Sequence, residues 1–140
     1  MSNKGEKIMN KKMYIFLTVL WGLPMSLIGT LAMIVLIISG HKLRKEPYSI
    51  VFEIGKGWGA VTIGYVVIRQ ESLSDAVRSH ERGHCIQNAM FGPLMPLTVG
   101  IPSLIRCIYR DIKYHRKGIK PQTEYDAIWF EKQATILGKY

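Results

Sequence analysis

The chain has 140 residues and a net charge of +9. A chain of this length forms one domain, or one small domain with a membrane anchor. Its two cysteines, Cys85 and Cys107, are too few for a disulfide framework. No helix-turn-helix, RNA-binding or zinc-finger pattern accompanies the basic residues, so we expect no nucleic-acid partner. The basic residues instead flank apolar stretches, as they do at anionic membrane surfaces, and lie at residues 4–12, 42–45 and 106–120.

The N-terminal third reads as a basic tail, residues 1–12, followed by a transmembrane segment, residues 13–39. The segment carries no charged side chain and exceeds the roughly 20 residues that a helix needs to cross a bilayer. A signal peptide is the competing interpretation, but the apolar run is too long and no small-residue cleavage site follows it. Trp21-Gly22-Leu23-Pro24 interrupts the run, which leaves a kinked span and a tight helical hairpin both open. We expect an integral protein of the bacterial inner membrane, with the lipid bilayer as a partner.

Residues 40–140 read as an α+β domain that begins with a short β-hairpin or sheet. Residues 48–54 and 60–69 are rich in Val, Ile, Tyr and Phe, which favours two strands. Gly55, Gly57 and Gly59 lie between them and predict a loose hairpin loop.

A helix over residues 73–90, with Ser72 or Ser74 as its N-cap, carries the strongest functional signal. It contains His-Glu-Arg-Gly-His at residues 80–84. His80 and His84 are one turn apart on the inward-facing side, where two neutral imidazoles can hold one Zn²⁺. Glu81 lies beside them and can take a proton from water. Two ordinary helix histidines are the alternative, but Glu81 and the inward-facing apolar stripe favour a metal site.

Residues 89–105 form a second apolar run, but three prolines and two glycines argue against a plain spanning helix. A re-entrant or interfacial membrane-associated segment, or a broken helix beside the site, is the expectation. The basic stretch that follows, residues 106–120, is expected to be solvated. A last helix is predicted over residues 125–137, ending at Gly138.

Catalytic zinc requires a third protein ligand. An extended motif would place a histidine at position 90, where this chain has Met90. His41 and His115 lie in basic stretches, which are unfavourable for a cation. The remaining acidic candidates beyond the motif are Asp111, Glu124, Asp126 and Glu131. Glu131 is best placed, since it lies within the last helix beside Ile128, Trp129 and Phe130, and Asp126 is the alternative.

His-Glu-x-x-His on one helix, followed by Glu-x-x-Ala on a later one, resembles the membrane gluzincins. These include CAAX-processing and heat-shock membrane peptidases and β-lactam-sensor metallopeptidases. The resemblance implies that His80, His84 and Glu131 bind zinc and that Glu81 is catalytic. The second motif usually reads Glu-x-x-Ala-Asp, with the aspartate supporting a histidine. Thr135 stands at the aspartate position here and brings no charge.

The C-terminal half, residues 80–138, also resembles small bacterial membrane proteins. Their pattern is His-Glu-x-Gly-His-x-x-Gln, then Leu-Gly-Pro-Leu and Gly-Ile-Pro-Ser-Leu-Ile, then Glu-Lys-Trp-Ala-Asp-x-Leu-Gly. In this chain Gln133 replaces the tryptophan and Thr135 the aspartate. This resemblance says little about substrate.

The leading expectation is a membrane-anchored zinc metallopeptidase of zincin type, acting on a peptide or membrane protein near the membrane surface. Residues 60–68 would receive the substrate as an added strand. The alternative is a non-catalytic membrane protein, with a regulatory or immunity role, that retains the zincin-type metal site. A basic membrane protein with a coincidental motif is a third interpretation. His80 and Glu131 can share a metal only from the same side of the bilayer, so residues 89–105 should not cross it.

Overall fold

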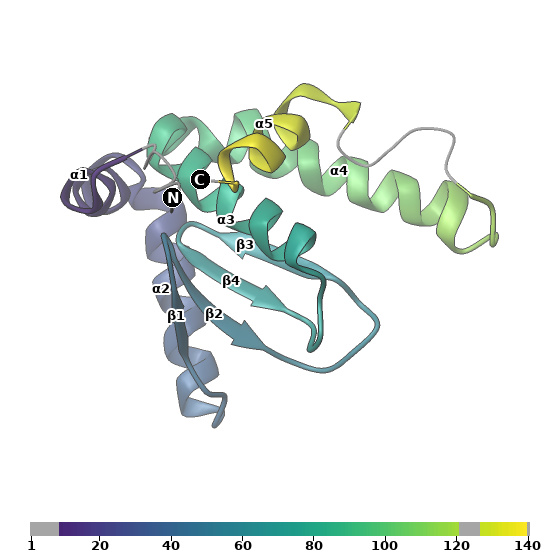
Figure 1. Cartoon of the computed structure of the whole chain (residues 1–140), viewed down its shortest axis with the longest axis horizontal. Coiled ribbons are helices and arrows are strands. Elements are labelled where there is room, and N and C mark those ends of the chain that lie inside the picture. Colours follow the sequence, from purple (N-terminus) through teal and green to yellow (C-terminus); the bar gives the residue numbers. More distant parts are fainter. Residues whose placement is uncertain (1–8, 121–126, 140) are drawn as a thin grey trace, which may run out of the picture.

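A four-stranded mixed sheet supports the helices in the computed structural model, which describes residues 9–120 and 127–139 (Figure 1). The strands are β1 (Arg44–Glu46), β2 (Ser49–Glu53), β3 (Ala60–Ile63) and β4 (Val66–Arg69). Their order across the sheet is β1-β2-β4-β3. Two antiparallel pairs, β1 with β2 and β3 with β4, are joined by the parallel pairing of β2 with β4. The expected α+β class is therefore confirmed.

Two expectations about the strands are wrong. Residues 60–69 form two strands, because a turn at Gly64 divides them. Gly64 has φ +64°, and a Cβ there would lie 2.7 Å from the Met25 carbonyl oxygen, so glycine is required. The glycine-rich loop after β2 also closes no hairpin, since β2 pairs with β4 and not with β3. Strand β1 was not expected, because its residues are charged.

Five α-helices lie within the described residues, several of them extended by tighter or wider turns. They are α1 (Lys11–Phe16), α2 (Leu23–Ile38), α3 (Asp75–Phe91), α4 (Ile101–Arg110) and α5 (Trp129–Leu137). π-helical turns follow α1 (Leu17–Trp21), precede α4 (Pro96–Gly100) and follow α4 (Asp111–His115). A 3₁₀ turn, Gly92–Leu94, follows α3. The stretch after residue 105, expected to be merely solvated, thus continues the helix as far as His115.

The sheet packs against α3 on one face. The side chains of Val51 and Val67, paired across β2 and β4, form a buried cluster with Cys85 of α3. On the same face Arg69 is 1% exposed, and its Nη2 lies 2.8 Å from carboxylate oxygens of both Glu46 and Glu53. These ion pairs connect β4 to β1 and β2, and they neutralise the buried guanidinium charge of Arg69, whose burial would otherwise be unfavourable.

Helix α2 approaches the turn that joins β3 to β4. A Cβ on Gly29 would lie 2.4 Å from the Ile63 carbonyl oxygen, so the absence of a side chain allows the two backbones to come together. The Thr30 hydroxyl contacts the Tyr65 hydroxyl at 2.7 Å. Helix α2 also contacts both β3 and β4.

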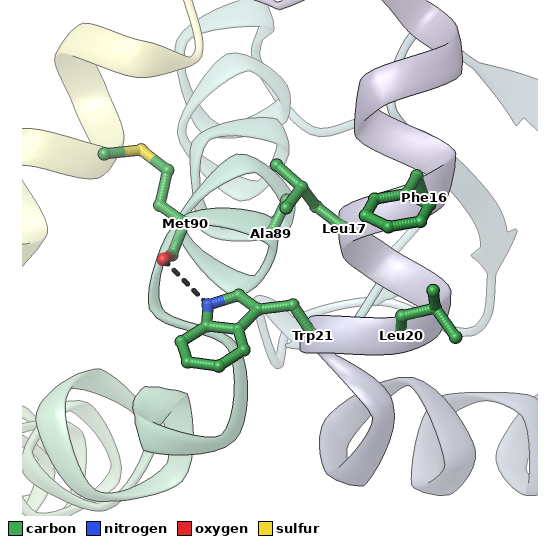
Figure 2. Close-up of a pocket in the computed structure, with 6 residues that line it drawn as sticks. All are labelled: Phe16, Leu17, Leu20, Trp21, Ala89 and Met90. Atoms are coloured by element: carbon green, nitrogen blue, oxygen red, sulfur yellow. Dashed lines mark hydrogen bonds between the residues drawn. The ribbon is translucent and has the colours of Figure 1, made fainter.

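The predicted interruption of residues 13–39 is confirmed as a sharp bend. Trp21 at the bend contacts the end of α3, and its indole Nε1 donates a 3.2 Å hydrogen bond to the Met90 carbonyl (Figure 2). Gly92, with φ +56°, lies against this indole, and a Cβ there would approach the ring to 2.3 Å. The bend is therefore held by a specific contact with the segment that follows α3.

No single helix in the described part of the chain is both long and apolar enough to cross a membrane. Two bent pairs meet the criteria of length and composition together. One is Lys11–Trp21 with Leu23–Ile38, bent by 94°, and the other is Asp75–Leu94 with Pro96–His115, bent by 118°.

Candidate metal centre

The HExxH motif lies on α3, as predicted. The Ser74 hydroxyl accepts a hydrogen bond from the Val77 amide and caps the helix, which confirms one of the two expected caps. His80 and His84 are one turn apart and face α5, which lies beside α3 (Figure 1). Glu131, in the first turn of α5, is fully buried between them.

The three predicted ligands converge on one point. His80 Nε2 lies 3.0 Å from Glu131 Oε2, and His84 Nε2 lies 3.2 Å from the same oxygen. The two histidine Nε2 atoms are 3.1 Å apart. In the described residues this is the one group of three or more His, Cys, Asp or Glu side chains arranged to hold a metal ion.

The spacing of these atoms fits a small tetrahedral cation. Bonds of about 2.0–2.1 Å in tetrahedral geometry place neighbouring ligand atoms about 3.3 Å apart. The three observed separations, 3.0, 3.1 and 3.2 Å, lie close to that value. Three protein ligands also leave a fourth position open, which distinguishes catalytic zinc sites from structural ones.

The hydrogen bonds of His80 direct its Nε2 lone pair toward this point. The Thr135 hydroxyl donates to the Glu131 carbonyl at 3.2 Å, so it accepts from His80 Nδ1, 2.9 Å away. The proton on Nδ1 leaves Nε2 unprotonated in the neutral ring, as metal binding requires. Thr135 therefore makes the contact with His80 that was expected of an aspartate, without adding a charge.

Substituting Thr135 should separate this orienting role from the size of the side chain. We expect Thr135→Val to weaken zinc binding by about 10–100-fold, the usual cost of losing the group that orients a ligating histidine. Thr135→Ser keeps the acceptor and should bind zinc like the wild type. Competition of each protein with a zinc chelator measures the difference. Equal affinities for the valine and serine variants would show that Thr135 does not orient His80.

His84 is oriented in the same way by Gln87. His84 Nδ1 lies 2.8 Å from Gln87 Oε1, while Gln87 Nε2 donates to the Phe130 carbonyl at 2.8 Å and to Gln133 Oε1 at 2.9 Å. The Phe130 carbonyl can only accept, so it fixes the orientation of the Gln87 amide. His84 Nδ1 is then the donor, and its Nε2 lone pair faces the shared point.

Glu131 is kept ionised in spite of its burial. Burial alone would raise the pKa of this carboxyl. Without a metal, imidazole protons shared between the Nε2 atoms of His80 and His84 and Glu131, together with the hydrogen bond from Ser103, outweigh burial and hold the pKa below its ordinary value. A metal ion at the shared point would take the place of those protons. The Ser103 hydroxyl of α4 donates to Oε1, which leaves Oε2 to face the histidines. Two imidazole lone pairs and one carboxylate oxygen thus point at one position, an arrangement that favours a cation there.

Two glycines bring α5 close enough to α3 for Glu131 to reach the histidines. A Cβ on Gly83 would lie 1.8 Å from the Ala134 carbonyl oxygen, and one on Gly138 would lie 1.6 Å from the Ser79 carbonyl oxygen. Neither position can carry a side chain while α3 and α5 keep this separation. Gly83, the glycine inside the motif, is therefore needed for Glu131 to reach the two histidines.

Glu81 faces β3 instead of the three ligand atoms. Glu81 is 8% exposed, and its Oε2 accepts a hydrogen bond from the Thr62 hydroxyl of β3. This bond occupies one oxygen and leaves the other available as a proton acceptor. The described structure therefore presents Glu81 beside the metal ligands without making it one of them.

The other residues weighed as third ligands do not join the group. His115 is paired with Asp111 at 3.4 Å on the exposed end of the α4 extension. His41 follows α2 and lies outside the group of convergent ligand atoms. Glu124 and Asp126 lie outside the described residues. Thr62, Ser103 and the roles of Gln87 and Gly83 were not predicted, although Gln87, Ser103 and Gly83 all occur in the motifs of the small bacterial membrane proteins.

Comparison with known proteins does not assign the chain to a family. No family model matches the chain, and neither a curated protein nor a solved structure is similar to it.

Proposed function

We propose that the protein is a membrane-anchored zinc metallopeptidase that hydrolyses a peptide bond at or near the membrane surface. The observation that carries the proposal is the convergence of His80 Nε2, His84 Nε2 and Glu131 Oε2 within 3.2 Å of one another, with Glu81 alongside. The resemblance of the two motifs to the membrane gluzincins points to the same chemistry.

The donor set favours zinc over other common metals. Two imidazole nitrogens and one carboxylate oxygen suit Zn²⁺, whereas Mg²⁺ and Ca²⁺ prefer an all-oxygen shell. When bound, Zn²⁺ supplies Lewis acidity that lowers the pKa of water to about 7 and polarises a carbonyl group. The chain's own contribution is to hold His80, His84 and Glu131 in a fixed geometry and to leave one position open.

Glu81 is proposed as the general base. The Thr62 hydroxyl neutralises part of the charge on Oε2 and fixes the carboxylate, so Oε1 is the atom that accepts the proton from the attacking water. The same carboxyl can return this proton to the amine leaving group, because acid and base roles alternate in hydrolysis.

Strand β3 is proposed as the binding edge for substrate. It is the last strand in the order β1-β2-β4-β3, and no described strand pairs with its outer side. An extended peptide can add to such an edge through main-chain hydrogen bonds. Because Thr62 of β3 contacts Glu81, a peptide aligned along this edge passes beside the proposed base.

Membrane attachment is proposed for α2 and α4. Both carry many exposed apolar side chains, including Ile38 of α2 at 81%, and Leu104 at 60% and Ile105 at 61% exposure in α4. Basic residues follow α2 at residues 42–45, and they run from the second half of α4 onward at residues 106–120. Exposed apolar faces of this extent mark contact with a membrane or another protein, and basic flanks favour an anionic membrane surface.

Glu81→Gln tests the catalytic role directly. The amide keeps the size of the side chain and can still accept from Thr62, but it cannot take a proton. We expect zinc content to stay at the wild-type level while hydrolysis of a fluorogenic peptide library falls by about 10²–10⁴-fold. Near wild-type turnover by this variant would exclude Glu81 as the base.

The alternative is a non-catalytic membrane regulatory or immunity protein that retains the metal site. The neutral Thr135 at the position of the usual aspartate favours it, because a neutral acceptor raises histidine basicity less than a carboxylate does. Stoichiometric zinc in the wild type together with no cleavage of any library peptide would support this alternative.

A further inference from the structure

A cavity lies away from the metal centre, between the bent α1–α2 arm and the β1–β2 hairpin. Its volume is about 1100 Å³, and none of His80, His84, Glu131 or Glu81 lines it. One wall is apolar and comes from both arms of the bend: Ile15, Val19, Leu23 and Leu27. A cavity of this size is at the upper end of those that hold small molecules.

Cations gather around the same cavity. Lys11, Lys45, Arg82 and Lys139 line it, from four different segments of the chain. The one acidic residue in the lining, Glu46, is already paired with the buried Arg69 at 2.8 Å. The cavity therefore carries a surplus of positive charge that the described residues do not neutralise.

Arg82 adds a second indication of a missing partner. Its Nε is buried, yet it has no hydrogen-bond acceptor among the described residues. A buried guanidinium nitrogen without an acceptor is unfavourable, and Arg is the side chain best suited to bind phosphate oxygens. Because Arg82 also lines the cavity, an anionic group bound there can pair with the charge of its guanidinium group.

We propose that this cavity binds one anionic phospholipid. The phosphate would lie among Arg82, Lys45 and Lys139, and an acyl chain would lie against Val19, Leu23 and Leu27. The apolar wall and the cationic lining together select an amphiphile, because a hydrophilic anion would leave the wall exposed and a neutral lipid would leave the four cations unbalanced. This site is independent of the proposed peptidase activity.

The test uses native mass spectrometry of the full chain, purified in a neutral detergent and titrated with phosphatidylglycerol or phosphatidylcholine. We expect one phosphatidylglycerol per chain, retained at least about fivefold more strongly than phosphatidylcholine. Lys45→Gln with Lys139→Gln should weaken phosphatidylglycerol binding by about thirtyfold, since each basic residue near an anionic lipid contributes about fivefold. The matched control, Lys56→Gln with Lys117→Gln, alters two exposed basic residues outside the cavity and should have no effect.

A second pair of variants keeps the test decisive if the lysine substitutions perturb folding. Val19→Trp fills the apolar part of the cavity and should reduce lipid retention, whereas Val35→Trp, also exposed on the bent arm but outside the cavity, should not. Equal retention of the two lipids, or no effect of Val19→Trp, would overturn the proposal. Displacement of the lipid by glycerol 3-phosphate alone would show a phosphate site and would also overturn it. Displacement by oleate but not by glycerol 3-phosphate supports an amphiphile site.

Discussion

Glu131→Gln should lower the zinc affinity of the protein by at least about a hundredfold, more than the loss of an orienting group costs. The amide removes the anionic ligand whose Oε2 lies 3.0 and 3.2 Å from the two histidine nitrogens. It also leaves a divalent cation at this position with no anionic ligand. Isothermal titration of the metal-free protein with zinc measures the change.

Glu71→Gln is the matched control for this substitution. Glu71 is exposed in the loop before α3 and belongs to no metal-binding group, so its variant should bind zinc like the wild type. Full zinc occupancy in Glu131→Gln would show that another residue is the third ligand, and Asp126 would be the next to test.

Gly83→Ala should destabilise the protein and reduce zinc binding together. The new Cβ would lie 1.8 Å from the Ala134 carbonyl oxygen, which is backbone and cannot rotate away. Helix α5 must therefore shift, and Glu131 shifts with it. We expect a loss of about 3 kcal/mol or more, at or above the upper end of ordinary overpacking, measured by urea denaturation followed by circular dichroism.

Gly100→Ala provides the control for a glycine in a helical segment. A Cβ at Gly100 meets only the Met95 carbonyl oxygen at 3.5 Å, which is ordinary contact. Alanine there should leave stability unchanged or raise it by about 0.5–1 kcal/mol, because glycine is the weaker helix former. Wild-type stability and zinc affinity in Gly83→Ala would contradict the close packing of α3 and α5.

The ligands could be predicted because their pattern is local or nearly so. His80 and His84 are related by the helical period, which the sequence displays directly. Glu131 followed from the small number of acidic residues and from the Glu-x-x-Ala resemblance. The structure places all three together, although nothing in the spacing of residues 84 and 131 specifies how the helices meet.

The contacts that support the ligands could not be predicted, because they depend on tertiary packing. Ser103 reaches Glu131 only because α4 folds back on α5, and Thr62 reaches Glu81 only because β3 is an edge strand beside α3. The glycine of the motif gave no sign of its role until the helix separation was known. Gly83 is needed because α3 and α5 approach each other closely at this position, and the sequence around Gly83 describes only α3.

The sheet topology also could not be predicted from the pattern of residues in the sequence. Strand propensity over residues 60–69 is continuous, so the turn at Gly64 is hidden in a run that favours strand. The parallel pairing of β2 with β4 joins segments separated by β3, and residue preferences carry little information about such an order.

Metal analysis of the purified protein tests the central claim most directly. Wild-type protein, exchanged into metal-free buffer and analysed by inductively coupled plasma mass spectrometry, should contain close to one zinc per chain. His84→Ala removes one of the three convergent nitrogen and oxygen donors and should contain almost none. Wild-type protein without bound zinc, or equal zinc content in the two proteins, would contradict the assignment of His80, His84 and Glu131 as a metal centre.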